Sequence, residues 1–390
     1  MARLGDRALF PDLADRVYLN HAAISPPSMP VRDACRRALD DYAALGAGAW
    51  LRYRDQRDAL RGQLAALIGA DTQDLALVAS TSQGLLDVAL CFPWQRGDRV
   101  VLLEGEFPAN VTAWQQAAVQ FGLDVTFLPV DDFVPRGPGL ERLEQVLRGG
   151  VRLVAVSAVQ FQTGLRMPLR AMAERCHAHG AELCVDAIQA VGVVPIDVRE
   201  TGVDYLVAGS HKGLMAPEGA GFLYVHPDRV GALRPLVAGW LSHEDGARFL
   251  FEGRGHLRYD RPIRRTADFL EFGAMNTLGF AGLGASVAIL SELGVAAIYD
   301  HVQAFHDVLE RGLVDLGFTS LRRPEPEARS SILAVRPPVG GASLQEVWER
   351  LGAAGIACSM PDGNLRFAPH WPNDVSQVPV VLEAAAGALR

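Results

Sequence analysis

The chain of 390 residues has 37 lysines and arginines, and only one of them, Lys212, is a lysine. It lies in the stretch LVAGSHKGLMAPEG (206–219), where an apolar run ends in Ser210, His211 and Lys212. Arginine stays protonated in proteins, whereas a desolvated lysine can lose its proton and form an imine. Lys212 is therefore a candidate imine-forming amine. The other interpretation is that Lys212 has no chemical role and is merely left over in a chain whose composition favours arginine.

Asp186 and Arg366 are two further charged residues in apolar surroundings. Asp186 ends the segment AELCVD (181–186), and a carboxylate in such a place needs a partner. That partner is either a backbone N–H in a turn or the protonated ring nitrogen of a bound cofactor. Arg366, in GNLRFAPHW (363–371), either meets a structural carboxylate or binds a substrate carboxylate in bidentate fashion.

Two more segments could contribute to a ligand site. The turn TSQG (81–84) precedes an apolar helical stretch, so its N–H groups either cradle a phosphate or merely cap the helix. Phe107 follows the apolar segment VVLLEGE (100–106), where its ring either stacks on a flat cofactor or belongs to the core. In an open α/β sheet the ligand crevice lies at the carboxyl ends of the strands, where all these residues are expected.

The elements that must position these residues are short apolar segments that alternate with helical patterns. Their continuous Val, Leu and Ala runs are typical of strands buried on both faces. We therefore expect an α/β fold with a mostly parallel central sheet and helices on both faces. Strands are predicted at 75–80, 98–107, 124–130, 151–159, 181–187, 203–210 and 219–225, and helices at 109–121, 139–148 and 168–179.

The pattern changes after about residue 280, where a long helical segment (280–318) begins. Strand-like segments at 330–337 and 364–369 alternate with helical ones at 343–355 and 375–390. This order predicts a smaller α+β domain. We expect a large domain of residues 16–280 and a small domain formed by 1–15 and 281–390.

Composition excludes several classes of protein. The formal net charge is −8 and no basic block occurs, so nucleic acid is not an expected partner. Five scattered cysteines without a CxxC pair predict neither a disulfide framework nor a metal site, and they fit a reducing cytoplasm. The N-terminal segment has no apolar h-region, and no run of 18 apolar residues occurs, so neither a signal peptide nor a membrane span is expected.

Taken together and in this order, the motifs resemble the class V aminotransferase and cysteine desulfurase superfamily of fold-type I pyridoxal-phosphate (PLP) enzymes. The resemblance covers nearly the whole chain and is most specific over residues 185–225, where Asp, Gln, His and Lys are in register. The segments that carry it are RVYLNHAAISPPS (16–28), STSQGLLDVA (80–89), EFPANVTAW (106–114), VDAIQAVGVVPIDVRETGVDYLVAGSHKGLMAPEGAGFLYV (185–225), FLEFGAMNTLGFAGLGASV (269–287) and LRFAPHWPND (365–374).

The resemblance implies a role for each candidate residue. Lys212 would hold the cofactor as an imine and move protons, while Asp186 would pair with the ring nitrogen. Gln189 would bind the ring's phenolic oxygen, Phe107 would stack on the ring, and Arg366 would bind the substrate α-carboxylate. The phosphate would be held by Thr81, Ser82, Gln83, Ser210 and His211. Asn276 would belong to the cofactor site, because it retains the Asn of the family's E-x-G-T-x-N segment. His21 and Gln162 could line the substrate side.

Several positions depart from the desulfurase pattern. Phe107 stands where desulfurases carry a proton-transferring His, and Phe161 where they carry an Asn. Cys358 is too close to Arg366 to be the mobile nucleophile, and the loop 322–331 has no cysteine. Ala274 replaces a Thr that reaches the partner subunit's phosphate in such dimers.

These features predict a PLP-dependent enzyme that acts on an amino acid, with a class V aminotransferase-like reaction as the first expectation. The alternative is a C–S or C–X lyase, of the cysteine desulfurase or selenocysteine lyase kind, or an epimerase. A nucleotide-binding oxidoreductase is disfavoured, because the Gly-rich run GFAGLG (279–284) does not follow a strand. We expect a cytoplasmic homodimer with both sites near the interface.

Overall fold

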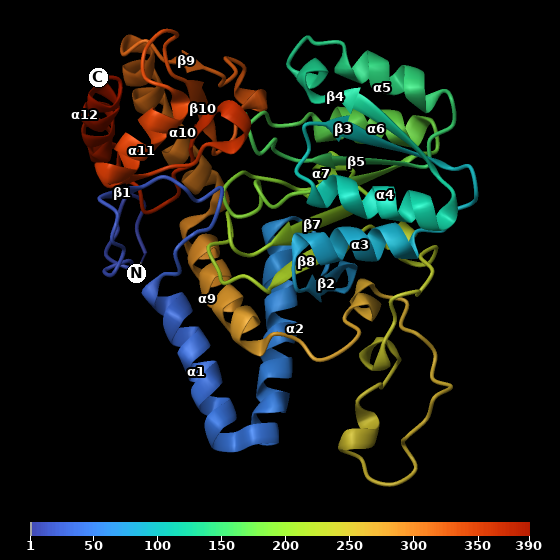
Figure 1. The fold of residues 1–390 in the computed structure, drawn as a ribbon. Coiled ribbons are helices and arrows are strands. Elements are labelled where there is room, and N and C mark those ends of the chain that lie inside the picture. The colour runs from blue at the N-terminus through green and yellow to red at the C-terminus, as the bar shows by residue number, and fades with distance from the viewer. Residues whose placement is uncertain (1) are drawn as a thin grey trace.

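A seven-stranded sheet forms the centre of the larger part of the molecule in the computed structural model, which describes residues 2–390 (Figure 1). Its strand order is β2-β8-β7-β6-β5-β3-β4. Five strands run parallel, and β8 pairs antiparallel with both β7 and β2. The strands are β2 Leu75–Val78, β3 Arg99–Glu104, β4 Asp124–Pro129, β5 Leu153–Ser157, β6 Glu182–Asp186, β7 Tyr205–Gly209 and β8 Gly221–Val225.

Helices cover both faces of this sheet, as the continuous apolar strands require. On one face α3 and α4 pack through residues such as Val88 and Trp114 against alternate strand residues. On the other face α2, α5, α6 and α9 pack in the same way. The mostly parallel, helix-covered sheet predicted from the sequence is confirmed. The helices are α2 Trp50–Leu67, α3 Thr81–Cys91, α4 Ala109–Phe121, α5 Gly139–Leu147, α6 Leu169–Ala178, α7 Val198–Thr201, α8 Pro227–Val230 and α9 Thr277–Leu293.

The C-terminal part has its own hydrophobic core beneath a three-stranded antiparallel sheet of order β12-β10-β9. A two-stranded parallel sheet joins it to the N-terminal segment, because β1 pairs with β11. The predicted domain boundaries remain a prediction. The elements are β1 Val17–Tyr18, α10 Val295–Asp315, β9 Thr319–Ser320, β10 Leu333–Arg336, α11 Leu344–Ala353, β11 Ile356–Ala357, β12 Leu365–Phe367 and α12 Val378–Ala388.

The long helical segment predicted after residue 280 is two helices. Gly294 adopts φ 79°, a left-handed conformation that favours glycine, and it separates α9 from α10. Within residues 2–390, no single helix has both the length and the apolarity of a membrane span. Only α9 and α10 taken together meet that test, with a 76° bend between them.

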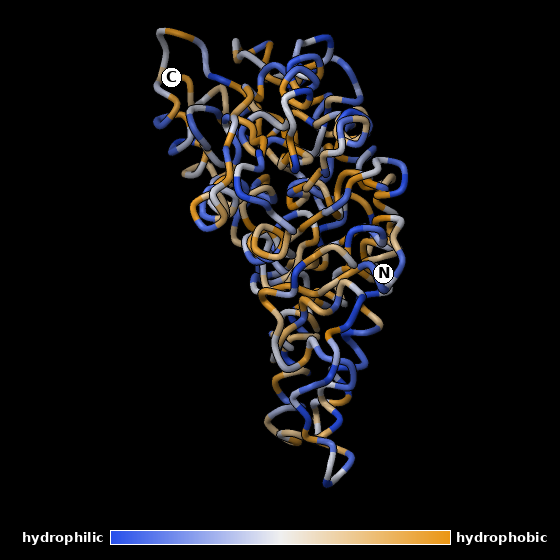
Figure 2. The backbone as a smooth tube through the Cα atoms, turned by 90° about the vertical axis from the view of Figure 1, so that its right-hand side faces the viewer, coloured by the Kyte–Doolittle hydropathy of each residue, from blue (hydrophilic) through white to orange (hydrophobic). Residues whose placement is uncertain are grey.

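Two helices that the sequence analysis did not predict form a projecting hairpin. Helix α1 (Met29–Leu45) and α2 extend away from the body of the molecule (Figure 1), and α9 packs against both. Figure 2 shows the molecule tapering toward this end, while hydrophobic backbone segments are densest in the wider part. Residues of α2 also line two cavities that are described below.

Candidate active site

Lys212 lies in the loop between β7 and β8, directly beyond the carboxyl end of β7. The loop is closed at its base by the Gly209–Gly221 pair and by a 3.0 Å hydrogen bond from Ser210 N to the Ala220 carbonyl. The Lys212 side chain is 9 % exposed, and the part of the chain that the structure describes offers its amine no ion pair or hydrogen bond. Burial lowers the pKa of Lys212 to about 8, against the opposing effect of Asp186. The amine therefore loses its proton close to neutral pH, as an imine-forming lysine must.

Asp186 is the buried carboxylate at the end of β6, the strand next to β7. Its Oδ1 accepts a 3.0 Å hydrogen bond from Ile188 N, and residues 2–390 provide no cation within ion-pairing distance. Burial raises the pKa of Asp186 to about 6, while Ile188 N–H and Lys212 lower it. Gln189 lies beside it and donates a 3.0 Å hydrogen bond to the Ala22 carbonyl. A protonated ring nitrogen would supply the partner that Asp186 lacks.

The loops that carry these two groups touch through their backbones. A Cβ atom at Gly192, which has φ 93°, would lie 2.4 Å from the Gly213 carbonyl oxygen. A Cβ atom at Gly213 would lie equally close, 2.4 Å, to the carbonyl oxygen of Val191. Both glycines are therefore required for the segment after Asp186 to pack against the residue after Lys212.

The N-terminus of α3 forms the wall predicted to hold a phosphate. Ser80 is the N-cap, and its Oγ accepts a 3.1 Å hydrogen bond from Gln83 N. This cap leaves the N–H groups of Thr81 and Ser82 without a backbone acceptor in the described chain. Thr81 Oγ1 accepts a 2.8 Å hydrogen bond from Gly209 N, which joins α3 to the end of β7. Free N–H groups at a helix N-terminus are a suitable anion site.

Three of the other residues predicted for the cofactor site, Gln83, Ser210 and Asn276, have hydrogen-bond partners of their own. Gln83 accepts from Ala79 N at 2.9 Å, and Ser210 donates to the Pro217 carbonyl. His211 is partly buried, and burial and Lys212 lower its pKa. Asn276 caps α9 through a 3.1 Å hydrogen bond from Gly279 N and donates to the Gly219 carbonyl at 3.1 Å. Any direct role of these four side chains on a phosphate remains a prediction.

Phe161 contacts both Phe107 and Arg366. The Lys212 amine is 5.4 Å from the centre of the Phe107 ring, and Phe161 packs edge-on against that ring with 5.4 Å between centres. Arg366 donates from Nη1 to the Phe161 carbonyl at 2.7 Å and from Nε to Ser359 Oγ at 2.9 Å. Burial lowers the pKa of Arg366 to about 10, because the described residues place no carboxylate against it. Arg366 therefore retains the capacity to bind a carboxylate.

The two remaining predicted residues flank this group. Gln162 follows Phe161 and donates a 2.7 Å hydrogen bond to Asp362 Oδ2. His21 is buried, and its Nδ1 is 2.8 Å from Ser25 Oγ, which in turn donates to the Lys212 carbonyl at 2.7 Å. Burial holds the pKa of His21 well below its ordinary value, so it supports the Lys212 loop as a neutral ring.

The sequence analysis missed Glu106, a buried carboxylate next to Phe107. Its Oε1 accepts from Ser157 N at 2.7 Å, and its Oε2 accepts from Ser157 Oγ. Ser157 pairs with Asp186 across β5 and β6, so two buried carboxylates lie close together. Burial raises the pKa of Glu106 to about 7, and Asp186 adds to the rise. The signal in the sequence was a second acidic residue just beyond the apolar run 100–103, at the end of the predicted strand.

None of the five cysteines forms a disulfide. Cys358, the one nearest Arg366 in the sequence, is 6 % exposed, and burial raises its pKa to about 12. A thiol held in its neutral form is a poor nucleophile. This agrees with the expectation that Cys358 is not the mobile nucleophile.

Comparison with known proteins defines the class. The model of the family "Aminotransferase class-V" matches residues 17–364. The uncharacterized aminotransferase YcbU of Bacillus subtilis is 29 % identical over 94 % of this chain and 93 % of its own length. A probable cysteine desulfurase of Methanothermobacter thermautotrophicus is 31 % identical over 75 % of this chain and 70 % of its own. The chain belongs to the class-V aminotransferase family.

Among solved structures, C-DES with glycine covalently linked to its PLP cofactor has a TM-score of 0.89 at 23 % identity, covering 98 % of this chain and 99 % of its own. At this identity the likeness shows the fold alone. The family is PLP-dependent, and PLP is the cofactor of this chain. The residues present fit it: an amine without a partner, a buried carboxylate without a cation, and free N–H groups at the start of α3.

Proposed function

We propose that the protein is a PLP-dependent C–S lyase that acts on a sulfur-containing amino acid. The sequence alone placed an aminotransferase first and the lyase second, and the comparisons favour the reverse order. The relatives include cysteine desulfurases, and C-DES is a cystine C–S lyase that has been solved with cysteine persulfide as its product. The aminotransferase remains the second candidate because of the likeness to YcbU over 94 % of the chain.

The observation that carries the proposal is the environment of the Lys212 amine. The amine faces the Phe107 ring, which packs against the ring of Phe161. The Phe161 carbonyl in turn accepts a hydrogen bond from Arg366, the proposed carboxylate-binding residue. No cysteine side chain with a low pKa accompanies Arg366, so sulfur transfer to the protein lacks a nucleophile. A lyase needs none, because its sulfur leaves with the product.

In this proposal each residue of the site has a separate role. PLP, when bound, supplies an electron sink that stabilises negative charge on the carbon next to the amino group. Lys212 takes the proton from that carbon as a free amine, which its pKa of about 8 permits near neutral pH. Asp186 keeps the ring nitrogen protonated and Arg366 orients the substrate carboxylate. Phe107, which is 45 % exposed beside the Lys212 amine, is available to stack on the cofactor ring. Overall, the Cα–H and Cβ–S bonds break, and the sulfur takes up a proton and leaves as hydrogen sulfide from cysteine or as cysteine persulfide from cystine. Water then hydrolyses the released enamine to pyruvate and ammonia.

The test is product analysis with the PLP-loaded protein. L-cystine, L-cysteine and L-alanine would be supplied separately, each with and without 2-oxoglutarate. A lyase produces pyruvate and ammonia from the sulfur amino acids without any oxo acid. An aminotransferase instead converts 2-oxoglutarate to glutamate and leaves no ammonia. Failure of both reactions, with Lys212→Ala as the blank, would contradict the proposal.

We also propose that the protein is a cytoplasmic homodimer. The support is the family, together with the exposed positions of Ala274 and Asn276 on a loop beside the cofactor-binding segments. Five free cysteines fit a reducing compartment. A monomeric mass in light scattering at micromolar concentration would contradict the dimer.

A further inference from the structure

Arg57 is a buried cation without a partner. It lies in the middle of α2 and is only 8 % exposed. Across residues 2–390 no hydrogen bond or ion pair reaches its guanidinium within bonding distance, and burial lowers its pKa. None of its guanidinium nitrogens is fully enclosed, so the group keeps some contact with solvent. A mostly buried charge has nevertheless lost much of its water without gaining a counter-charge, which is costly. Such a group requires an explanation.

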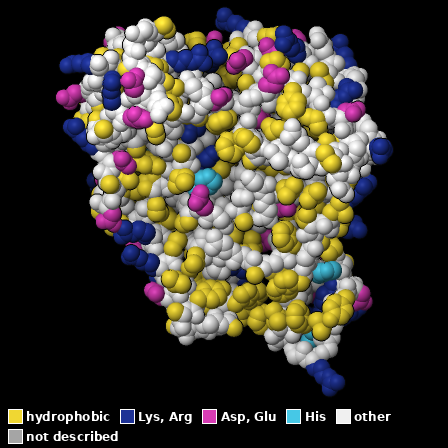
Figure 3. Space-filling model, viewed as in Figure 1, with side chains coloured by type: hydrophobic (Ala, Val, Ile, Leu, Met, Phe, Trp, Pro, Cys, Tyr) yellow, Lys and Arg dark blue, Asp and Glu magenta, His cyan; other side chains and the backbone are white. Residues whose placement is uncertain are grey.

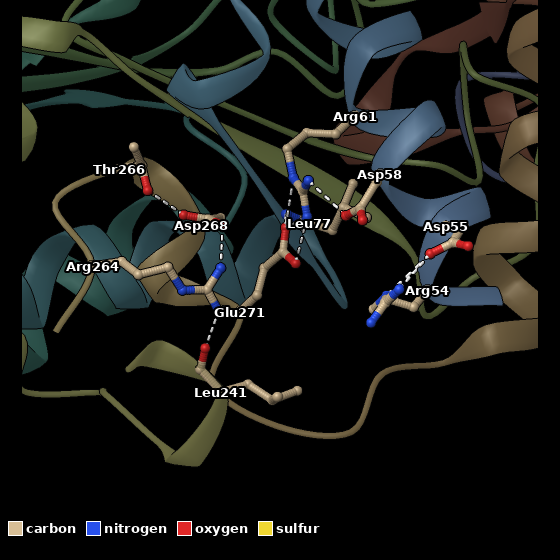
Figure 4. A network of polar contacts seen from close by, with 10 residues as sticks. All are labelled: Arg54, Asp55, Asp58, Arg61, Leu77, Leu241, Arg264, Thr266, Asp268 and Glu271. Carbon is tan, nitrogen blue, oxygen red and sulfur yellow. Dashed lines mark hydrogen bonds and ion pairs between the residues drawn. The ribbon is translucent and has the colours of Figure 1, made fainter. Parts of the chain in front are cut away.

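The nearest acidic side chain is already engaged. Glu271 faces both Arg57 and Arg61, yet its two oxygens accept from the Arg61 guanidinium at 2.8–3.1 Å and from Leu77 N at 2.8 Å. Arg61 also pairs with Asp58 at 3.0 Å. Figure 4 shows this network, in which Arg61 and Glu271 point toward each other from α2 and from the segment before α9.

Arg57 borders a cavity of about 420 Å³ in which it is the only charged residue among the lining side chains of the described chain. The walls are aromatic and aliphatic, with Tyr42, Trp50 and Leu241 among them, and the far side is the segment 273–278. Asn276 lines it too, but both ends of its side-chain amide are bound to backbone. Tyr42 Oη and Thr277 Oγ1, 3.4 Å apart, and the indole N–H of Trp50 are further polar groups of the lining residues.

A second cavity of about 490 Å³ lies on the other side of the same wall and shares Trp50, Arg57, Leu241 and Met275 with the first. Several of its acidic and basic side chains are paired with each other: Arg264 with Asp268, Arg248 with Glu252, and Arg61 with Glu271. Arg54 pairs with Asp55, and Asp245 lies 3.7–3.8 Å from Arg248 and Arg261. Arg57 is thus the cation left over after these pairs form. The smaller cavity, whose other walls are uncharged, is where its charge is uncompensated.

We propose that Arg57 binds a carboxylate carried on an apolar or aromatic body in the 420 Å³ cavity, a site separate from the Lys212 pocket. A guanidinium matches a carboxylate in bidentate geometry. A single cation in an apolar wall suits a monoanion better than a phosphate, which would need more donors. The cavity volume falls within the range of about 300–1,000 Å³ typical of small-molecule sites.

The carboxylate has two sources, a free organic acid or an acidic residue of a second copy of the chain. Two of the apolar side chains that line the cavity, Leu39 and Leu278, are exposed at the molecular surface. Figure 3 shows hydrophobic side chains gathered along the lower part of the face that is seen in that view. Both sources present the same group to Arg57, so the test needs one arm for each.

The first arm titrates PLP-loaded protein with 3-phenylpropionate and follows the heat of binding by calorimetry. Tryptophan fluorescence is unsuitable, because the control residue Arg54 lies over the ring of Trp50, 5.7 Å from its centre. Arg57→Gln is compared with Arg54→Gln, a matched control one turn away on α2 whose side chain pairs with Asp55 and does not line this cavity. Saturable binding that weakens at least tenfold in Arg57→Gln alone is the expected result. 3-Phenylpropionamide should bind at least tenfold more weakly than the acid.

The second arm measures self-association of the same variants by sedimentation equilibrium. If the second copy supplies the carboxylate, Arg57→Gln raises the dimer dissociation constant at least tenfold and Arg54→Gln does not. The proposal is overturned if the two variants behave alike in both arms, or if the amide binds as tightly as the acid. Neither readout depends on catalysis, so this proposal and the proposed function can fail separately.

Discussion

The molecule contains two buried cations without partners, and they differ in what their chemistry permits. Lys212 lies in a loop fixed at both ends by backbone hydrogen bonds, with a pKa of about 8, and can give up its charge. Arg57 lies in the middle of a helix and cannot, because a guanidinium stays protonated. The same structural sign, a desolvated cation without a counter-charge, therefore indicates a nucleophile in one region and a ligand site in the other.

The largest expected effect comes from replacing Lys212 by arginine, which cannot give up its charge. Lys212→Arg keeps a positive charge but cannot form an imine or act as a base. We expect the visible absorbance of the bound cofactor to disappear and kcat to fall at least about 10³-fold, since general acid–base catalysis alone contributes about 10²–10⁴-fold. Absorbance spectra and steady-state rates measure this. Retention of both by the variant would show that Lys212 is not the imine-forming group.

The second prediction compares the paired and unpaired arginines of α2. Arg61→Met leaves Glu271 buried without its partner and should lower the free energy of unfolding by about 3–5 kcal/mol. Arg57→Met removes a charge that has no partner and should leave stability unchanged or increase it. Urea denaturation of both variants at one pH is the measurement. A large loss in Arg57→Met would mean that Arg57 has an intramolecular acceptor in solution.

The third prediction concerns Glu106 beside Asp186. Its pKa is about 7 in the folded protein, above that of an unfolded chain, so the folded state binds the proton more tightly. Its contribution to stability is therefore complete at low pH and is lost as pH rises toward 7, by up to about 3 kcal/mol. Glu106→Gln should thus gain stability relative to wild type between pH 5 and pH 8. Melting curves of the apoproteins test it, and a constant difference across that range would contradict it.

The smallest effect concerns the rate of cofactor uptake. Only the neutral amine of Lys212 attacks an aldehyde, and its pKa is about 8. Uptake of PLP by the apoprotein should accelerate about tenfold per pH unit below 8 and then level off, as expected for titration of one group. Stopped-flow absorbance from pH 6 to 9 measures this. A profile that keeps rising beyond pH 9 would mean that the amine is not desolvated in solution.

Much of the fold was predictable because the strands are buried on both faces. Continuous apolar runs such as 153–157 are typical of strands that are buried on both faces. Helix α4 begins and ends at the residues that its pattern predicted. The hairpin of α1 and α2 was missed because its exposed faces are long and rich in Arg, which dilutes the apolar period. The break at Gly294 was missed because the apolar pattern continues on both sides of it.

The candidate site was predictable where residues follow strands in one sheet, since topology brings strand ends together. Glu106 and Arg57 could not be found this way. Whether a carboxylate or a guanidinium has a partner depends on residues far away in the sequence, such as Ser157 for Glu106 and the engaged Glu271 for Arg57. Sequence shows a charge, but only the packed structure shows whether it is balanced.

The contact between Gly192 and Gly213 has a consequence for how this enzyme can vary. The spacing between the amine-bearing loop and the carboxylate-bearing loop is set by two backbones in contact, not by the volumes of neighbouring side chains. Core residues around the site can therefore be exchanged over evolutionary time, or in a design library, without altering that spacing. Diversity aimed at new substrates belongs around Phe161 and Gln162, whereas positions 192 and 213 are best left as glycine.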